Sequence, residues 1–189
     1  MGSISRAVFL DRDGVINRKA PDGEYIKSWE EFEFLNGAPE AVALLKQNGF
    51  LVILVTNQRG ISLGKVREED VREIHRRMQR QLWDVGAKMD AVYYCPHDYG
   101  QCSCRKPDVG MFLQAKRDFP TIDFTKSFVI GDSKVDMEAA ARLNCGKILI
   151  ADKDSSLLQE LAEMGVEIGF TSFCLREAVA DFILSTSSQ

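Results

Sequence analysis

Residues 7–14 read AVFLDRDG, and this stretch decides the fold. Its first four residues are apolar and are followed at once by charged residues, which is typical of a short buried strand in a parallel sheet. Ligands of open α/β sheets bind outside the carboxyl ends of the strands. Asp11 and Asp13 would stand at such an end, where two carboxylates suit a hard cation together with acid or nucleophile chemistry. The competing interpretation is a solvated turn, since Asp and Gly are common in turns.

Apolar, strand-like runs alternate with amphipathic helical stretches along most of the chain. We expect strands at Val8–Leu10, Leu51–Thr56, Ala91–Tyr94, Ser127–Ile130 and Lys147–Ile150, and a weaker one at Ile168–Phe170. The expected helices are Pro39–Gln47, Glu68–Val85, Gly110–Asp118, Val135–Leu143, Ser156–Met164 and Leu175–Leu184. This order predicts an α/β fold with a doubly wound parallel sheet, in a single domain over residues 1–189. Residues 15–34 do not follow the alternation and indicate a flap beside the first carboxylates.

Composition excludes several classes of protein. An apolar content of 45% and a charged content of 28% are ordinary for a globular domain. The net charge of -4 provides no overall basic field for nucleic acid. No apolar run reaches membrane-spanning length, and no signal peptide is recognisable before the first strand. Three of the five cysteines lie within ten residues, which favours a metal site over disulfides and therefore a reducing cytoplasm.

Two further polar clusters weaken the solvated-turn interpretation. Residues 56–59 follow the second expected strand and carry hydroxyl, amide and guanidinium groups that suit phosphate oxygens, although a turn would explain part of this cluster. Arg105 and Lys106 precede the third expected helix. Lysine is a compact point charge suited to a phosphoryl group, and the alternative is a helix-entry loop with exposed cations.

A third cluster, residues 131–136, follows the fourth expected strand. Asp132 leaves that strand, and Asp136 lies about one turn into the next helix. Gly131 would allow close approach of the backbone. Compensation of the helix N-terminus is a contributing role for Asp136. Each cluster is weak evidence alone, but their order along the chain is specific.

Residues 95–104 read CPHDYGQCSC and form the second strong signal. Cys95, His97, Cys102 and Cys104 make up a full tetrahedral set of zinc ligands with no open position, which is typical of a structural site. Three free thiols at this density are the less plausible alternative. Zinc would fasten the loop that precedes Lys106, so its loss should damage catalysis indirectly.

Three other residues of the same types are expected to have ordinary roles. Cys145 and Cys174 are predicted to be buried apolar residues and not ligands. His75 lies beside two arginines and is predicted to stand on a solvated helix face. A basic face that binds a partner is a less favoured interpretation of the same residues.

The clusters, taken in order, resemble the four motifs of the haloacid dehalogenase-like phosphohydrolases: DxD, Thr, Lys and GDxxxD. The resemblance spans about residues 7–150. It implies a Rossmann-like, haloacid dehalogenase-like fold with no large cap domain, so that the flap and the zinc loop close the site. It also implies Mg²⁺-dependent phosphotransfer through an aspartyl-phosphate.

The resemblance further implies a role for each matching residue. Asp11 would be the nucleophile, Thr56 and Lys106 would stabilise the phosphoryl group, and Asp132 would bind Mg²⁺ with Asp11 and the backbone carbonyl of Asp13. Asp13 would be the general acid and base. A sugar alkoxide needs a proton to leave, so the pKa of Asp13 is expected to be raised. The implied substrate-binding set consists of Arg18, Lys19, Asn57, Gln58, Arg105 and Lys134.

Asp-Arg-Asp-Gly, Thr-Asn-Gln and Cys-Arg-Lys-Pro, together with the zinc loop, are similar to the D-glycero-D-manno-heptose 1,7-bisphosphate 7-phosphatases and, close behind, to the histidinol-phosphate phosphatases. The segment Asn17–Gly37 resembles the heptose enzymes more, whereas the short stretch between His97 and Cys102 is a departure from many of them. The implied activity is release of the C7 phosphate of the bisphosphate, giving heptose 1-phosphate. The alternative is a histidinol-phosphate phosphatase or another small phosphomonoesterase.

Two interpretations without enzymatic activity compete with this one. A phospho-receiver domain also places Asp, Thr and Lys around Mg²⁺, but its phosphorylated Asp ends a middle strand and it has no place for a zinc loop. A zinc-stabilised binding module would not need both Asp11 and Asp13. The expected partner is therefore a small phosphorylated sugar, with no nucleic acid or membrane partner, bound by a monomer.

Overall fold

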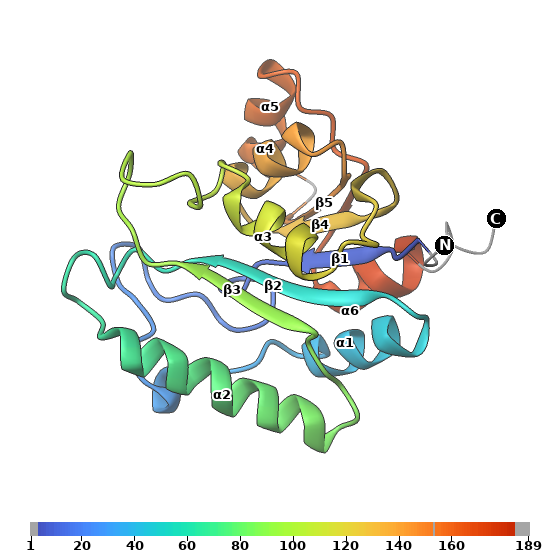
Figure 1. Ribbon diagram of the computed structural model, residues 1–189. Coiled ribbons are helices and arrows are strands. Elements are labelled where there is room, and N and C mark those ends of the chain that lie inside the picture. The colour runs from blue at the N-terminus through green and yellow to red at the C-terminus, as the bar shows by residue number, and fades with distance from the viewer. Residues whose placement is uncertain (1–3, 153, 184–189) are drawn as a thin grey trace.

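The computed structural model describes residues 4–152 and 154–183 of the chain (Figure 1). Six parallel strands form one sheet in the order β3-β2-β1-β4-β5-β6. Their bounds are β1 (Ala7–Leu10), β2 (Leu51–Asn57), β3 (Ala91–Cys95), β4 (Phe128–Gly131), β5 (Gly146–Ile150) and β6 (Phe170–Ser172). The predicted doubly wound parallel sheet is confirmed.

Helices cover both faces of this sheet. Figure 1 shows α1, α2 and α6 on one side, and α3, α4 and α5 on the other. Their bounds are α1 (Ala38–Gln47), α2 (Glu68–Asp84), α3 (Gly110–Asp118), α4 (Lys134–Arg142), α5 (Ser156–Glu163) and α6 (Leu175–Glu177). Among the described residues, no helix combines the length and the apolar character needed to cross a membrane.

Two predicted elements are placed differently in the structure. The weak strand predicted at Ile168–Phe170 begins only at Phe170, which pairs with Ile148 of β5. Ile168 precedes it and packs against the small apolar cluster around Leu161, so its hydrophobicity reflects packing of a loop. The predicted last helix is α-helical over Leu175–Glu177 and continues as a π-helix over Ala178–Ile183, and its predicted end lies outside the described residues.

The central strand β1 shows why the chain folds in this way. All four of its residues are fully buried, because the strand has a helical layer on each face. Val8 and Leu10 join the core beneath α1 and α2, and Ala7 and Phe9 join the core beneath α3 and α4. The second core also contains Cys145, which is buried as predicted. Cys174, predicted to be buried, is partly exposed.

The order of the strands locates the place where a ligand can bind. The chain runs from β1 outward to β2 and β3, and then returns to β4 on the other side of β1. The connections therefore diverge between β1 and β4, and a crevice opens outside the carboxyl ends of these two strands. Asp11 and Asp132 directly follow β1 and β4, respectively.

The predicted flap is pinned to the fold at its base. Asn17 forms isolated β-bridges to Asp13 and to Phe34, which joins the start of the flap to its end. Val15 and Ile16 are fully buried in the core below the sheet. Residues 19–26 reach the crevice at the carboxyl ends of the strands.

Candidate active site

A cavity of about 350 Å³ lies at the carboxyl ends of β1, β2 and β4. The end of β1, the flap, the loop after β2, the zinc loop and the start of the loop before α4 all contribute side chains to it. Of the residues singled out from the sequence, the cavity is lined by Asp11, Asp13, Lys19, Thr56, Asn57, Gln58, Arg105, Lys106 and Asp132.

Two residues predicted to bind substrate lie elsewhere. The exposed Arg18 side chain pairs with Glu33 across the base of the flap, at 3.1 Å. Lys134 is the first residue of α4, and its side chain pairs with Glu160 of α5. Neither residue lines the cavity, so their predicted place in the site is corrected.

A buried lysine joins two carboxylates at the bottom of the cavity. The Nζ atom of Lys106 lies 2.9 Å from Oδ1 of Asp11 and 2.6 Å from Oδ1 of Asp136, and it donates to the carbonyl of Val55 at 2.7 Å. Burial lowers the pKa of Lys106, but the charges of Asp11 and Asp136 outweigh it and raise the pKa. The ammonium group is therefore charged at neutral pH.

The side chain of Asn57 holds this lysine in place. Its Oδ1 accepts from the backbone N–H of Lys106 at 3.0 Å, and its Nδ2 donates to the backbone carbonyl of Lys106 at 3.1 Å. Asn57 thus acts on the loop that carries Lys106. Its amide oxygen and one of its two N–H donors are engaged in these two hydrogen bonds.

Three carboxylates gather around the end of β1. Oxygen atoms of Asp11, Asp132 and Asp136 lie within 4.8 Å of one another. Burial raises the pKa of Asp11 to about 6, and the nearby Lys106 charge opposes this only in part. Burial and the charge of Asp11 also raise the pKa of Asp132. Carboxylate oxygens at this spacing are a donor set that suits a hard divalent cation.

Two glycines make this approach possible. A Cβ atom at Gly131 would lie 2.3 Å from the Cβ of Asp136, and one at Gly14 would lie 2.1 Å from Oδ2 of Asp132. Gly14 also has a φ of 86°, which side chains rarely adopt. The predicted close approach at Gly131 is confirmed.

Asp136 has a larger part in the site than the sequence indicated. Its side chain is almost fully buried, pairs with Lys106 and accepts from the hydroxyl of Ser133. A carboxylate that only interacts with the positive N-terminal end of the helix dipole can remain exposed, so this role does not explain the burial of Asp136. The four-residue spacing from Asp132, on the first turn of a helix, is the signal in the sequence that brings the two carboxylates together.

The carboxylate of Asp13 is surrounded by donors. Arg12 donates from Nη2 to both oxygens at 2.9 Å, and Asn17 and Gln58 donate from their amides at 3.0 and 3.1 Å. Burial raises the pKa of Asp13, but the Arg12 charge and these hydrogen bonds together lower it below its ordinary value. The prediction of a raised pKa for Asp13 is wrong for the structure as it stands.

His75 was also predicted wrongly. It is buried, its Nε2 lies 3.3 Å from Nη1 of Arg12, and burial followed by the Arg12 charge lowers its pKa to about 3. Of its two neighbours, Arg76 is exposed and Arg77 is half-buried, and both pair with Glu73. The buried face of α2 repeats at helical spacing through Val71, Ile74, His75, Met78 and Leu82, and this pattern could have placed the histidine inside.

The four predicted zinc ligands converge in the loop after β3. The Sγ of Cys104 lies 3.2 Å from that of Cys95, 3.0 Å from that of Cys102 and 3.4 Å from Nδ1 of His97. All four donor atoms lie within 4.8 Å of one another. Three thiols and an imidazole at such distances fit a tetrahedral zinc site, in which zinc lies about 2.0–2.3 Å from each ligand.

The tip of the same loop reaches the mouth of the cavity through residues that the sequence did not single out. Asp98 pairs with Arg59 at 2.5 Å. The ring of Tyr99 lies 4.6 Å from the guanidinium carbon of Arg59 and 4.4 Å from that of Arg105. The loop therefore connects Arg59, which follows β2, to Arg105, the arginine predicted to contact substrate.

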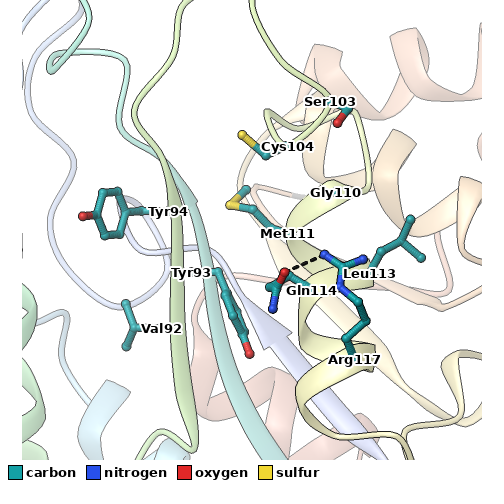
Figure 2. Close-up of a pocket in the computed structure, with 10 residues that line it drawn as sticks. All are labelled: Val92, Tyr93, Tyr94, Ser103, Cys104, Gly110, Met111, Leu113, Gln114 and Arg117. Atoms are coloured by element: carbon teal, nitrogen blue, oxygen red, sulfur yellow. Dashed lines mark hydrogen bonds between the residues drawn. The ribbon is translucent and has the colours of Figure 1, made fainter.

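A second pocket, of about 510 Å³, lies on the outer side of the zinc loop between β3 and α3. Figure 2 shows its lining, which includes Tyr93, Met111 and Cys104, with a hydrogen bond from Arg117 to Gln114 at 2.5 Å. Among the residues that the structure describes, none with a carboxylate side chain lines this pocket. The cavity at the strand ends, which contains the carboxylates and Lys106, is therefore the candidate active site.

Comparisons with known proteins agree with this geometry. A family model described as polynucleotide kinase 3 phosphatase matches residues 7–156. A D-glycero-beta-D-manno-heptose-1,7-bisphosphate 7-phosphatase of Vibrio cholerae is 45% identical over 153 residues, which cover 76% of this chain and 80% of the relative. A D-glycero-alpha-D-manno-heptose-1,7-bisphosphate 7-phosphatase of Mycobacterium bovis is 38% identical over 173 residues, covering 86% and 90%.

A solved structure extends the similarity to the fold. It is a D,D-heptose 1,7-bisphosphate phosphatase from B. bronchiseptica complexed with magnesium and phosphate, with a TM-score of 0.82 and 31% identity. The alignment covers 95% of this chain and 99% of that one. The parallel sheet, the carboxylates at the end of β1 and the sequence match over most of the chain agree with one another. The chain therefore belongs to the haloacid dehalogenase-like phosphatases, in the family that contains the heptose bisphosphate phosphatases.

Proposed function

We propose that the protein is a Mg²⁺-dependent phosphatase that removes the C7 phosphate of D-glycero-D-manno-heptose 1,7-bisphosphate, giving heptose 1-phosphate and phosphate. The observation that carries the proposal is the contact between Asp11, at the end of β1, and the buried Lys106 at the bottom of the cavity. Relatives named for this substrate, in both anomeric forms, support the choice of sugar.

The first step in this proposal is attack by Asp11 on the phosphorus atom. Hydrolysis of a phosphate monoester needs an acceleration that reaches about 10²¹-fold, and most of it must come from positioning and neutralisation of charge. Lys106 is placed to offset charge on the phosphoryl oxygens. The hydroxyl of Thr56 accepts from Gln58 at 3.0 Å, so its own proton can be donated to the phosphoryl group.

Mg²⁺ fits the oxygen donors at the strand ends. We propose that Asp11, Asp132 and the backbone carbonyl of Asp13 hold it, and the magnesium in the similar solved structure supports this. When bound, Mg²⁺ would offset the repulsion between the anionic carboxylate and the anionic phosphate. Lys19, which lies 2.9 Å from Asp132, provides a further positive charge at the same edge of the cavity.

Asp13 is proposed to move the protons. It would protonate the leaving sugar oxygen as the P–O bond breaks, and would then take a proton from the water that hydrolyses the aspartyl-phosphate. The ionised carboxylate that Arg12 stabilises is the form needed for this second step. A phosphate dianion that enters beside Asp13 raises its pKa and favours the protonated form needed for the first.

The Cys₃His set is proposed to bind a structural zinc ion. Cys102→Ser is expected to remove about one equivalent of zinc and to lower the Tm by about 5–10 °C, since each kcal/mol lost shifts the Tm of a chain of this size by about 2–4 °C. Cys174→Ser, outside the ligand set, should change neither. Elemental analysis and thermal unfolding are the measurements, and untreated wild-type protein that lacks near-stoichiometric zinc would refute the assignment.

Arg105 is proposed to select the bisphosphate. Within the described part of the chain its buried Nε has no hydrogen-bond partner, and its guanidinium is held against Tyr99 at the cavity mouth. Such a group suits a second anion. Arg105→Ala should lower kcat/KM for the bisphosphate by about 100-fold, equal to about 2.7 kcal/mol, but for p-nitrophenyl phosphate by less than about fivefold. The matched control is Lys134→Ala, which removes one positive charge outside the cavity; equal losses for both substrates would exclude a selecting role.

A substrate panel tests the proposed function as a whole. We expect kcat/KM for the α- or the β-anomer of heptose 1,7-bisphosphate to exceed that for histidinol phosphate by at least about 100-fold, because a site built for two anions leaves polar groups unpaired on a monophosphate. A clear preference for histidinol phosphate would overturn the choice of sugar. It would leave the aspartyl-phosphate mechanism in place.

A further inference from the structure

Behind the proposed acid and base lies a row of three side chains, the buried His75 of α2, the buried Arg12 and the half-buried Asp13. We propose that His75 is a positioning residue, which holds the guanidinium of Arg12 and through it fixes the direction of the Asp13 carboxylate. This inference rests on the role given to Asp13 in the proposed function. It adds a residue more than sixty positions away in the sequence to the machinery for proton transfer.

The geometry of Arg12 requires a partner on each side. The residue is 1% exposed, so water cannot satisfy its five N–H donors. Its Nη2 donates to both oxygens of Asp13 at 2.9 Å, and its Nε lies 3.3 Å from Oδ1. Its Nη1 points the other way and lies 3.3 Å from Nε2 of His75. Asp13 and His75 therefore hold opposite ends of one planar group.

The hydrogen-bonding roles in this row follow from the chemistry of the guanidinium. It can only donate, so Nε2 of His75 must accept, and the proton of the neutral imidazole lies on Nδ1. A positively charged ring would offer no acceptor and would repel Arg12. Histidine in this tautomer presents a lone pair in the plane of its ring, which orients the guanidinium as well as satisfying it.

The histidine itself is held firmly. It lies on the buried face of α2 between Val71 and Met78, and its ring lies 5.6 Å from that of Tyr94 on β3. The hydroxyl of Tyr94 donates to Glu68 at 2.7 Å, at the start of the same helix. The packing of α2 against the edge of the sheet therefore fixes the position of His75, and through it the position of Arg12.

At the other end of the row, Asp13 has little freedom to turn. Amide groups of Asn17, from the base of the flap, and of Gln58, from the loop after β2, donate to its two oxygens. Loss of the His75 contact would release one end of Arg12 and allow the guanidinium and the carboxylate to shift together. A misplacement of about 1 Å in a reacting group can cost about 100-fold in rate.

Substrates with different leaving groups distinguish a role of His75 in positioning Asp13 from a role in stabilising the fold. An alkyl phosphate releases a strongly basic alkoxide, which needs the proton of Asp13 as the P–O bond breaks. p-Nitrophenyl phosphate releases a weakly basic phenolate, which leaves without that proton. A misplaced Asp13 therefore slows the alkyl ester more than the aryl ester, whereas general damage to the fold slows both alike.

The experiment compares His75→Leu, which lacks the acceptor, with His75→Gln, whose side-chain oxygen can replace it. Arg76→Ala, on the exposed face of the same helix, is the control. Values of kcat and KM are measured with p-nitrophenyl phosphate and with the alkyl phosphate that the wild type hydrolyses best, which is the heptose bisphosphate by our proposal. The experiment can therefore be carried out whichever sugar phosphate the enzyme prefers. The proposed role of His75 and the proposed substrate can be refuted independently of each other.

We expect His75→Leu to lower kcat for the alkyl phosphate by about 10- to 100-fold, with KM within about twofold and the loss for the aryl phosphate below about threefold. His75→Gln should recover most of the rate, and Arg76→Ala should match the wild type. If the leucine variant does not fold, His75→Asn, whose shorter amide does not reach Nη1, should show the same loss. Equal losses for the two esters, a loss confined to KM, or no loss in a folded variant would overturn the proposal.

Discussion

Replacing Asp11 by Asn is expected to lower kcat by at least about 10³-fold, which corresponds to about 4 kcal/mol of transition-state stabilisation. The amide keeps the size of the side chain but lacks the anionic oxygen that is proposed to form the bond to phosphorus. Asp11 is also one of the three clustered carboxylates, so the change weakens the proposed Mg²⁺ site as well. The measurement is phosphate release with saturating substrate and Mg²⁺.

The fold should survive this change, because the zinc loop is separate from the carboxylate cluster and the Asn side chain fits the same space. The variant is therefore expected to fold, with a cooperative thermal transition, and to contain as much zinc as the wild type. Asp154→Asn, the same chemical change at an exposed position, is the matched control for activity. Retention of even a tenth of the wild-type kcat would rule Asp11 out as the nucleophile.

Replacing Lys106 by Met is expected to lower kcat by about 10²–10³-fold and to destabilise the protein by about 3–5 kcal/mol. Lys106 is 1% exposed and lies between the partly buried Asp11 and the buried Asp136, so its removal leaves both carboxylates without their shared cation. Methionine keeps most of the length of the side chain, which separates the loss of charge from the loss of packing. Lys88→Met, at an exposed position, should change neither quantity.

The stability change should also depend on pH in a defined direction. The pKa of Asp11 is raised to about 6 with Lys106 in place, and loss of that cation raises it further. A raised pKa in a carboxyl group destabilises the folded state above that pKa and not below the ordinary value. The difference in Tm between wild type and Lys106→Met, measured without Mg²⁺, should therefore shrink from pH 8 to pH 5. A difference that does not change with pH would contradict the contact between these charges as the cause.

The fold could be predicted from the sequence because its main signals are local. The four apolar residues of β1 are buried on both faces, so an uninterrupted apolar run was the correct pattern for a central parallel strand. The same reasoning failed at Ile168, where an apolar side chain packs from a loop before β6 begins. Periodicity reports burial, and it does not distinguish a strand from a loop that packs against the core.

The site could be predicted in its clusters but not in the direction of each side chain. Asn17 and Arg18 are adjacent in an extended, paired segment, so their side chains point to opposite sides. Asn17 donates to Asp13, and Arg18 is left outside with Glu33. Arg18, which the family resemblance assigned to the substrate-binding set, therefore lies outside the cavity.

The lowered pKa of Asp13 could not be predicted from the sequence, for a related reason. The direction of the shift in this pKa depends on the Arg12 side chain, which folds back beside Asp13, and on Gln58, which follows another strand. The position of Arg12 depends in turn on a histidine of α2. A charged pair of neighbours in a motif does not reveal whether the two side chains meet until the surrounding elements are packed.

The most direct test of the central claim is to identify the products made from heptose 1,7-bisphosphate by phosphorus NMR. The account predicts one equivalent of inorganic phosphate and a sugar that retains only its anomeric phosphate, formed in the presence of Mg²⁺. A product that retains the C7 phosphate, or a bisphosphate left unchanged by active enzyme, would contradict it.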